Sequence, residues 1–221
     1  MAAKPPAARG AAAEGHVDRL LSACAVIERG RFCWHQHHPP IRGGTRGESG
    51  LPDREVVWHG RAYMLEVKEE TGTSAALGCL SRPDDGKRPA HGVTWQQAEE
   101  MDRATLAGVP CFVVMVLTVP AKAAKRRKDG TVSDSGQTAA TIARIVPWPA
   151  WRALMQTAED QRAAVAQWQR DSGRAMVAHG PTCPLPPKPT VDASIPAADL
   201  ATMGHPCRNA TELLKALGQP C

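Results

Sequence analysis

Residues 50–68, GLPDREVVWHGRAYMLEVK, predict a tight β-hairpin that brings three charged side chains to one point. Two valines and a tryptophan favour a first strand, and the His-Gly pair at 59–60 suits a two-residue turn because glycine adopts positive φ freely. In the second strand the side chains alternate, so Glu66 and Lys68 share one face, about 6–7 Å apart along the strand. If the strands pair about this turn, Asp53 lies close to the Glu66–Lys68 end of its partner.

Two carboxylates and an amine at one strand end suit the binding of a hard divalent cation. Mg²⁺ and Mn²⁺ prefer carboxylate, carbonyl and water oxygens, so Asp53 and Glu66 could hold such an ion beside a nucleophilic water. Lys68 could orient that water and stabilise developing negative charge. The alternative is purely structural, because an alternating Glu-x-Lys strand is also typical of a solvated sheet face.

This pattern resembles the motif of a nuclease superfamily. Gly50-x-Pro52-Asp53, a short gap and then Glu66-x-Lys68 on a strand are similar to the PD-(D/E)xK signature. The nearer resemblance is to the virus-type replication-repair nuclease (VRR-NUC) domain and to the related RecU-type Holliday junction resolvases. The resemblance covers roughly half of the chain, from about residue 14 to about residue 117.

The resemblance continues after the hairpin, in the order of that family's core. Gln97 lies in a helix expected over residues 94–107 and closed by Gly108, and an apolar strand follows over residues 109–119. The resemblance implies an α/β fold with a restriction-endonuclease-like core, in which a central mixed β-sheet is flanked by helices. An extra C-terminal helix and a flexible tail would be added to this core.

The resemblance also implies roles for the residues of the hairpin. Asp53 and Glu66 would bind Mg²⁺ or Mn²⁺, and the backbone carbonyl of Val67 would supply another ligand. Lys68 would act on the attacking water. The chain would then be a Mg²⁺-dependent endodeoxyribonuclease.

Two further positions leave alternatives open. In the resembled family a Glu near the start of the first helix often completes the metal site, and here Glu14 matches best, with Asp18 as its rival; an acid there also simply favours a helix N-terminus. Thr94-x-x-Gln97 is a capping box, whereas in the resembled family Gln97 would lie at the active site, and we favour that second role. Gln96 would replace Gln97 if the helix began one residue earlier.

Basic segments supply candidate DNA contacts, since phosphate groups attract Lys and Arg side chains. A Gly/Arg segment at residues 41–49, expected beside the hairpin, carries Arg42 and Arg46. A loop at residues 120–137 carries the densest positive run in the chain. Its members are Lys122, Lys125, Arg126, Arg127 and Lys128. For both segments the alternative is an ordinary solvated loop.

Composition narrows the class of protein. The 221 residues have a net charge of +5, which is compatible with a polyanionic partner such as DNA. Seven scattered cysteines, no apolar leader and no apolar run of membrane-spanning length predict a cytoplasmic protein with reduced thiols and no membrane partner. Cys33 and the nearby histidines do not predict zinc, because no second ligand pair with suitable spacing occurs. These histidines are His35, His37 and His38.

We expect a flexible leader at residues 1–13, a nuclease-like domain at 14–178, and a Pro-rich linker with a short helix at 179–221. The first helix would run over 14–28, with Val26 and Ile27 in its apolar stripe. The other expected elements are a strand at 31–35, a loop at 69–93, a strand at 138–147, a helix at 149–171 and a helix at 210–217. The helix at 149–171 would pack on the sheet or on a second subunit, which would make a homodimer.

The leading functional hypothesis is a metal-dependent DNA endonuclease that acts on branched or otherwise structured DNA in replication, repair or recombination. One alternative is a restriction-like or phage nuclease that cuts duplex DNA. Another is a nucleic-acid-binding module that keeps the fold without cleavage. The presence of Asp53, Glu66 and Lys68 together argues against an inactive module.

Overall fold

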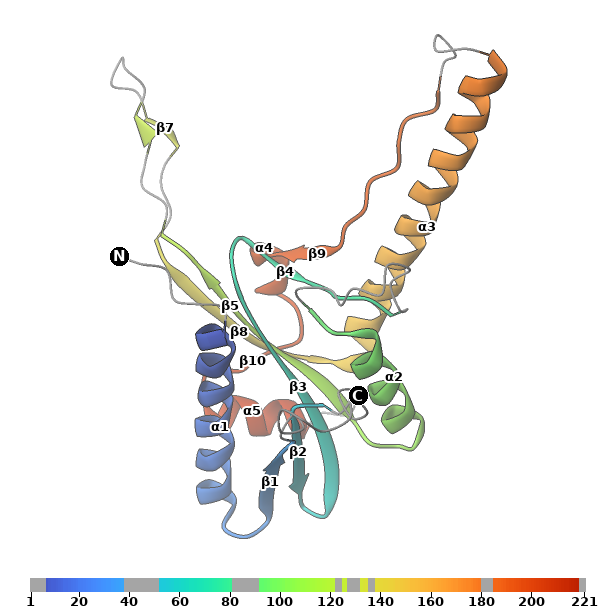
Figure 1. The fold of residues 1–221 in the computed structure, drawn as a ribbon. Helices are drawn as coiled ribbons and strands as arrows, with labels where there is room; N and C mark the ends of the chain where they lie inside the picture. The colour runs from blue at the N-terminus through green and yellow to red at the C-terminus, as the bar shows by residue number, and fades with distance from the viewer. Residues whose placement is uncertain are drawn as a thin grey trace.

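The computed structural model describes residues 7–37, 52–80, 92–121, 125–126, 132–134, 138–179 and 185–218. The described part is built on a mixed six-stranded sheet with the order β1-β2-β3-β5-β8-β10 (Figure 1). β3 and β5 are parallel, and the other neighbouring pairs are antiparallel. These strands are β1 (Phe32–Gln36), β2 (Arg54–Trp58), β3 (Arg61–Thr71), β5 (Cys111–Val119), β8 (Ala140–Pro147) and β10 (His205–Pro206).

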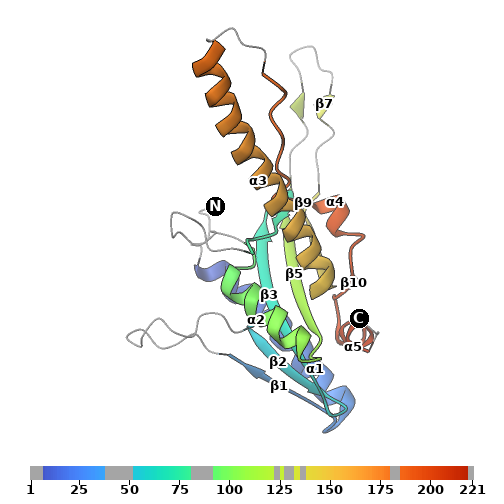
Figure 2. The same cartoon turned by 90° about the vertical axis from the view of Figure 1, so that its right-hand side faces the viewer.

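Helices cover both faces of the sheet, which is therefore the middle of three layers (Figure 2). α1 (Ala7–Glu28) and α5 (Ala210–Leu217) pack on one face. α2 (Trp95–Leu106), the first part of α3 (Trp148–His179) and the short α4 (Ala197–Leu200) pack on the other. The predicted fold class, α/β with a central mixed sheet flanked by helices, is confirmed.

The hairpin predicted from residues 50–68 is formed by β2 and β3. His59 and Gly60 have φ of 50° and 76°, as a two-residue turn between twisted strands requires, and the pairing runs from Trp58 opposite Arg61 to Arg54 opposite Leu65. The alternation is also confirmed. The face of β3 that packs under α1 and α5 carries Tyr63, Leu65 and Val67.

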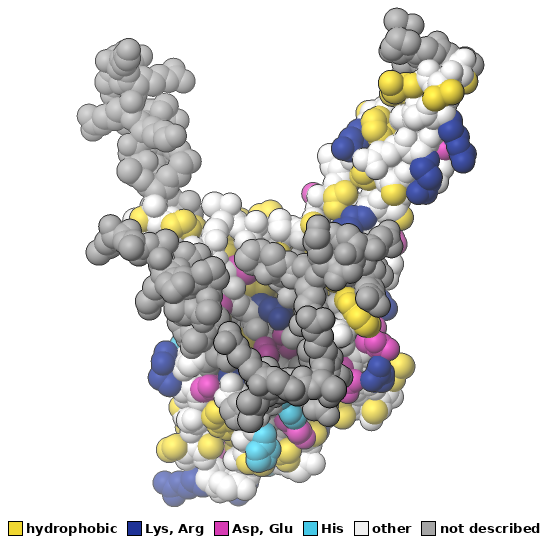
Figure 3. Space-filling view, viewed as in Figure 1, with side chains coloured by type: hydrophobic (Ala, Val, Ile, Leu, Met, Phe, Trp, Pro, Cys, Tyr) yellow, Lys and Arg dark blue, Asp and Glu magenta, His cyan; other side chains and the backbone are white. Residues whose placement is uncertain are grey.

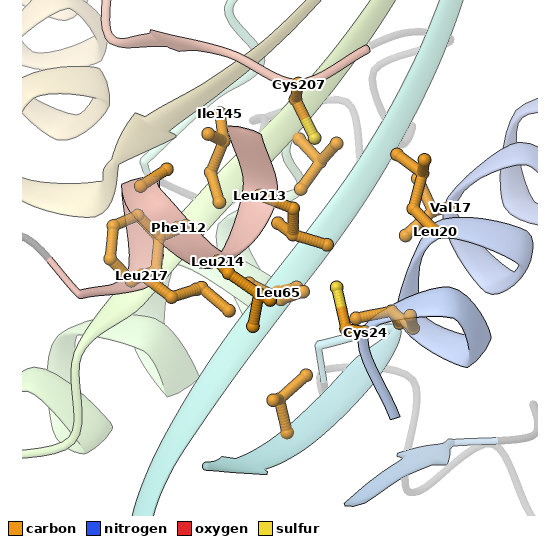
Figure 4. Packing of buried hydrophobic residues seen from close by; sticks show 14 of the residues in the cluster. Val17, Leu20, Cys24, Leu65, Phe112, Ile145, Cys207, Leu213, Leu214 and Leu217 are labelled. Atoms are coloured by element: carbon orange, nitrogen blue, oxygen red, sulfur yellow. The ribbon is translucent and has the colours of Figure 1, made fainter. Parts of the chain in front are cut away.

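The apolar cluster under α1 and α5 holds that side of the molecule together (Figure 4). Leu213 and Leu217 of α5 meet Leu65 of β3 and Phe112 of β5, while Cys24 of α1 lies beside them. The expected stripe of α1 is wrong at its end. The side chains of Val26 and Ile27 are 76% and 54% exposed, because the buried stripe of α1 ends at Cys24.

α1 begins earlier than the sequence pattern predicted. It starts at Ala7 rather than at residue 14, so part of the expected leader is helical. The reason is local composition, because residues 7–13 are mostly alanine, the strongest helix former. The expected strand at residues 31–35 and the expected helix at 94–107 are present as β1 and α2. Gly108, which follows α2, has φ of 83°.

The expected loop at residues 69–93 is partly ordered. β3 continues to Thr71, and β4 (Ser74–Ala76) pairs with β9 (Ser194–Pro196). An isolated bridge joins Gly78 to Val93, and residues 81–91 lie outside the described part. At Gly78 a Cβ would meet the backbone of Val93 at 1.9 Å, so no larger residue fits this close approach.

α3 is longer than predicted, reaching His179 rather than residue 171. Its first turns are buried against the sheet through Trp151, Met155 and Ala158. Its distal half extends away from the sheet, and the returning chain runs beside it (Figure 1). The Trp168 indole donates to the carbonyl of Pro186 at 2.8 Å.

The chain after residue 193 belongs to the core rather than to a separate tail. β10 pairs with β8, and α5 buries Leu213, Leu214 and Leu217. The helix predicted at residues 210–217 is confirmed, with Asn209 as its N-cap. Residues 219–221, in the expected tail, lie outside the described part.

The structure bears on membrane-spanning segments and on the state of the cysteines. The described helices include no segment long and apolar enough to span a membrane. Within the described residues the cysteines are free thiols, and they are Cys24, Cys33, Cys79, Cys111 and Cys207.

Candidate functional site

Asp53 immediately precedes β2 and lies opposite the middle of β3. Its Oδ2 accepts a hydrogen bond from the backbone N–H of Val67 at 2.9 Å. The β2–β3 ladder ends where Arg54 lies opposite Leu65. The bond from Val67 to the Asp53 side chain therefore adds one contact between the two strands beyond the end of the ladder. The hairpin therefore places Asp53 at the Glu66–Lys68 end of β3, as the sequence predicts.

Glu66 is completely buried, on the opposite side of β3 from Leu65 and Val67. Burial raises its pKa to about 8, because a carboxylate loses solvation there. The Lys68 ammonium lowers the pKa, whereas the negative charge of Asp53 raises it further. The two carboxyl groups are thus close enough to compete for a proton, as in other paired acids.

Lys68 and Gln97 complete a network around Glu66. Lys68 Nζ lies 2.5 Å from Glu66 Oε1, and Gln97 Nε2 donates to the same oxygen at 2.6 Å. Lys68 Nζ also donates to Gln97 Oε1 at 3.2 Å. The ammonium is about four-fifths buried, since its side chain is 18% exposed. Each of the three groups therefore fixes the orientation of the other two.

Gln97 forms the capping box and also reaches Glu66. The capping box is formed, because Thr94 Oγ1 accepts from the Gln97 N–H and Gln97 Oε1 accepts from the Thr94 N–H. The same side chain uses its Nε2 for Glu66. α2 begins at Trp95, so Gln97 is at the third helical position. The start of α2 thus presents a side-chain amide to the site.

The backbone carbonyl of Val67 faces the Asp53 side of β3. Met64 donates its N–H to Pro110, at the β5 edge, and Val67 donates to Asp53, at the β2 edge. Because the N–H and C=O of one strand residue point to the same edge, the Val67 carbonyl also points past the end of β2. This direction suits the ligand role that the sequence resemblance implies for Val67.

The two candidate third acids behave differently. Asp18 accepts from Arg54 Nε through its Oδ1 at 2.7 Å, so its carboxylate is engaged in an ion pair. Glu14 lies on α1, one turn earlier, but its side chain is outside what the structure describes. Neither acid is brought to Glu66 by a contact among the described residues.

Arg54 is a site residue that the sequence reasoning missed. Its side chain is 1% exposed and donates to the Asp53 carbonyl at 2.8 Å. The available signal was the strand alternation, which puts Arg54 on the same core-facing side as Val56. A charged residue at such a position needs a buried partner.

Most of the predicted DNA-contacting residues cannot be placed. Arg42, Arg46, Lys122, Arg127 and Lys128 lie outside the described residues. Lys125 and Arg126 are described only as backbone, in the short β6 (Lys125–Arg126), which pairs with β7 (Val132–Asp134). The expected loop at residues 120–137 therefore contains a short antiparallel strand pair. Figure 3 shows other Lys and Arg side chains along the distal half of α3.

The donor set can be tested for its fit to a divalent cation. Glu66 Oε2 is buried and accepts no hydrogen bond from the described residues, and a buried carboxylate oxygen without a donor is the kind of atom a cation satisfies. Asp53 Oδ1 and the Val67 carbonyl are the neighbouring oxygens. Among the described side chains there is no cluster of three or more His, Cys, Asp or Glu that could hold a metal. Two carboxylates, one carbonyl and water remain, which is a normal set for Mg²⁺.

Charged side chains of both signs meet at the middle of the face that Figure 3 presents, over β3 and α2. No protein-family model and no curated protein matches this sequence.

Proposed function

We propose that this protein is a metal-dependent DNA endonuclease that hydrolyses phosphodiester bonds. The observation that carries the proposal is the arrangement of Asp53, before β2, with Glu66 and Lys68 of β3, and with a buried Glu66 oxygen that accepts no hydrogen bond from the described residues. These groups suit the hydrolysis of a phosphodiester better than a solvated face, because Glu66 is buried and its carboxyl group is bonded to Lys68 and Gln97.

Each residue of the site has a chemical task in this proposal. Asp53, Glu66 and the Val67 carbonyl would hold Mg²⁺ or Mn²⁺, which polarises a phosphate and lowers the pKa of bound water. Lys68, kept in place by Glu66 and Gln97, orients the attacking water and stabilises the charge that develops on the phosphate. Gln97 bonds to both the Lys68 ammonium and the Glu66 carboxylate and so fixes their positions relative to each other.

The preference for branched or structured DNA is supported by the resemblance to VRR-NUC domains and RecU-type resolvases, and so are the roles in repair and recombination. A cytoplasmic location is a prediction from composition, and a homodimer is a prediction from the apolar face of the helix at residues 149–171. The basic run of residues 122–128 supports nucleic acid as the partner.

A cleavage assay tests the proposal. Purified protein is incubated with flap, four-way and plain duplex DNA of matched sequence, with Mg²⁺, with Mn²⁺ or with EDTA. We expect cutting that requires the metal and is faster on a branched substrate. Equal cutting of plain duplex would favour a restriction-like nuclease. Binding of all three DNAs without cutting would contradict the enzyme and leave a binding module.

A further inference from the structure

Arg54 joins helix α1 to the candidate site. Its side chain is 1% exposed, and its guanidinium lies on the α1 side of the sheet, the face opposite to Glu66 and Lys68. There Nε donates to Asp18 Oδ1 at 2.7 Å, while Nη1 donates to the backbone carbonyl of Asp53 at 2.8 Å. One planar group therefore connects an acid on α1 with the backbone of the candidate metal ligand.

Asp53 needs such support, because it precedes the first paired residue of β2. The β2–β3 ladder begins at Arg54, so no ladder bond to β3 fixes the residue. Its carbonyl instead accepts from Arg54 and from the His37 N–H, at 2.8 and 3.1 Å. Its carboxylate accepts from the Val67 N–H. The direction of the carboxylate thus depends on groups that hold the backbone from behind the sheet.

We propose that Arg54, anchored by Asp18, is a positioning residue that sets the Asp53 carboxylate for metal binding. This inference rests on the proposed function and assigns Asp18 to the Arg54 ion pair rather than to the metal. A guanidinium can donate in two fixed directions at once, whereas an ammonium is a single point donor. Lysine at position 54 could reach Asp18 or the Asp53 carbonyl, but would not hold both in the same geometry.

Asp18 acts through Arg54 in this scheme. Removing one partner of a buried ion pair leaves the other charge without compensation, and that charge moves or recruits water. A substitution of Asp18 should therefore disturb Asp53, although the two acids lie on different elements. Outer groups that orient metal ligands typically change metal affinity by about 10–100-fold when they are removed.

The Val67 amide gives a readout that needs neither metal nor DNA. Its proton reports the Val67–Asp53 hydrogen bond through its NMR chemical shift and its hydrogen-exchange rate. In Arg54→Lys we expect this resonance to move towards its position in Asp53→Ala and its exchange to become at least about tenfold faster. Asp18→Asn should give the same change, and the double variant should be no worse than the stronger single one.

Mn²⁺ binding, measured by calorimetry on the same variants, gives the second readout. We expect affinity to fall by about tenfold in Arg54→Lys and in Asp18→Asn. The matched control is Arg152→Lys, whose Nε pairs with Asp102 at 2.9 Å between α3 and α2. That variant should leave both the Val67 amide and Mn²⁺ affinity unchanged.

Two results would overturn the inference. If the chemical shift and exchange rate of the Val67 amide do not change in Arg54→Lys, Arg54 does not position Asp53. This conclusion holds whether or not the protein cleaves DNA. The second result is a loss of Mn²⁺ affinity in Asp18→Asn without a change in the Val67 amide resonance, together with additive effects in the double variant. It would show that Asp18 is itself a metal ligand. If Arg54→Lys does not fold, Asp18→Asn carries the same test, because the Asp18 side chain is 29% exposed. Absence of DNA cutting by the unaltered protein would contradict the proposed function but leave the amide result intact.

Discussion

Glu66 is a fully buried carboxyl group that shares one oxygen between an ammonium and a side-chain amide. Its pKa of about 8 means that the metal-free site holds a proton at neutral pH. A divalent cation would have to displace that proton, because the carboxylate is the form that binds metal. The same burial that makes the acid costly to ionise would make its contact with a cation strong.

We therefore predict that Mn²⁺ binding releases about one proton at pH 6.5 and almost none at pH 9, with an affinity that rises by up to about tenfold per pH unit below pH 8. Calorimetry in buffers of different ionisation enthalpy measures the proton count. A proton count that does not change with pH would contradict the raised pKa or the place of Glu66 in the metal site.

The same group makes the metal-free protein sensitive to pH. The pKa of Glu66 is higher in the folded chain than its ordinary value of 4.5, so its favourable contribution is complete below that value and is lost as pH rises through about 8. Over this interval the stability of the unaltered protein should fall relative to Glu66→Gln by at most about 1.4 kcal/mol per pH unit. Thermal unfolding of both proteins at pH 5 to 9 measures the difference.

Lys68→Ala should lower cleavage by about 10²–10³-fold while DNA binding stays nearly unchanged, because the ammonium acts on the reacting water and phosphate. Lys215→Ala is the matched control, since this lysine is exposed on α5, on the other face of the sheet. Single-turnover cleavage and binding are measured on one DNA substrate. Full activity in Lys68→Ala would refute the assigned role.

Among the helices and strands, α2 connects its N-terminal capping box to the site, because Gln97 belongs to both. Thr94→Ala removes the cap and should cost about 1 kcal/mol of stability, but it leaves the Gln97–Glu66 bond. Gln97→Ala removes the return bond of the capping box and the bond to Glu66, so it should also lower cleavage. Denaturant unfolding and cleavage rates separate the two effects. If Thr94→Ala lowers cleavage as much as Gln97→Ala does, Gln97 acts only through the start of the helix.

Local patterns predicted most elements of this fold because their signals are short-range. The hairpin at residues 50–68, the capped helix α2 and the helix at residues 210–217 follow from turn residues, caps and periodicity. The same patterns placed Asp53 beside Glu66, because a two-residue turn determines the register. They missed the Arg54–Asp18 pair, which joins residues 36 positions apart through a buried contact.

The sequence does not predict which elements α5 packs against, for a related reason. β10, which ties this part of the chain to the sheet, has only two residues and no periodicity. What α5 covers is decided by contacts with α1, β3 and β5 from distant parts of the chain. A pattern read along the sequence does not contain that information.

We predict that Leu213→Ala destabilises the protein by about 2–5 kcal/mol, because this side chain is fully buried in the cluster under α1 and α5. Val177→Ala is the control, since Val177 lies on the distal half of α3 and is 90% exposed, so its effect should stay within about 0.5 kcal/mol. Chemical denaturation measures both. Equal stability of the two variants would mean that α5 is not part of the cooperative core.

At the scale of the whole molecule, two projections leave the sheet in Figure 1. One is the β6–β7 pair, and the other is the distal half of α3 with the chain that returns beside it. Exposed cations on α3 occur together with acids such as Asp160 and Asp171, whereas the run at residues 122–128 contains five cations, two alanines and no acid. The charge balance therefore favours the β6–β7 pair as the surface for DNA.

Replacing Lys125, Arg126, Arg127 and Lys128 by alanine should weaken DNA binding and flatten its dependence on salt, by as much as about 3–4 in the logarithmic slope if all four contact phosphates. Replacing Arg170, Arg174 and Lys188 is the matched control and should leave the slope unchanged. Equilibrium binding at several salt concentrations measures both. A normal slope in the first variant would remove the basic run from the interface.

In the proposed site, Asp53, Glu66 and the Val67 carbonyl would hold one divalent cation beside Lys68. Anomalous diffraction from crystals soaked in Mn²⁺ tests it directly. We expect a manganese peak about 2.0–2.3 Å from an oxygen of Asp53 and from Glu66 Oε2, with the Lys68 amine close by. Manganese bound elsewhere, or a site without manganese in which Glu66 stays paired only with Lys68 and Gln97, would contradict it.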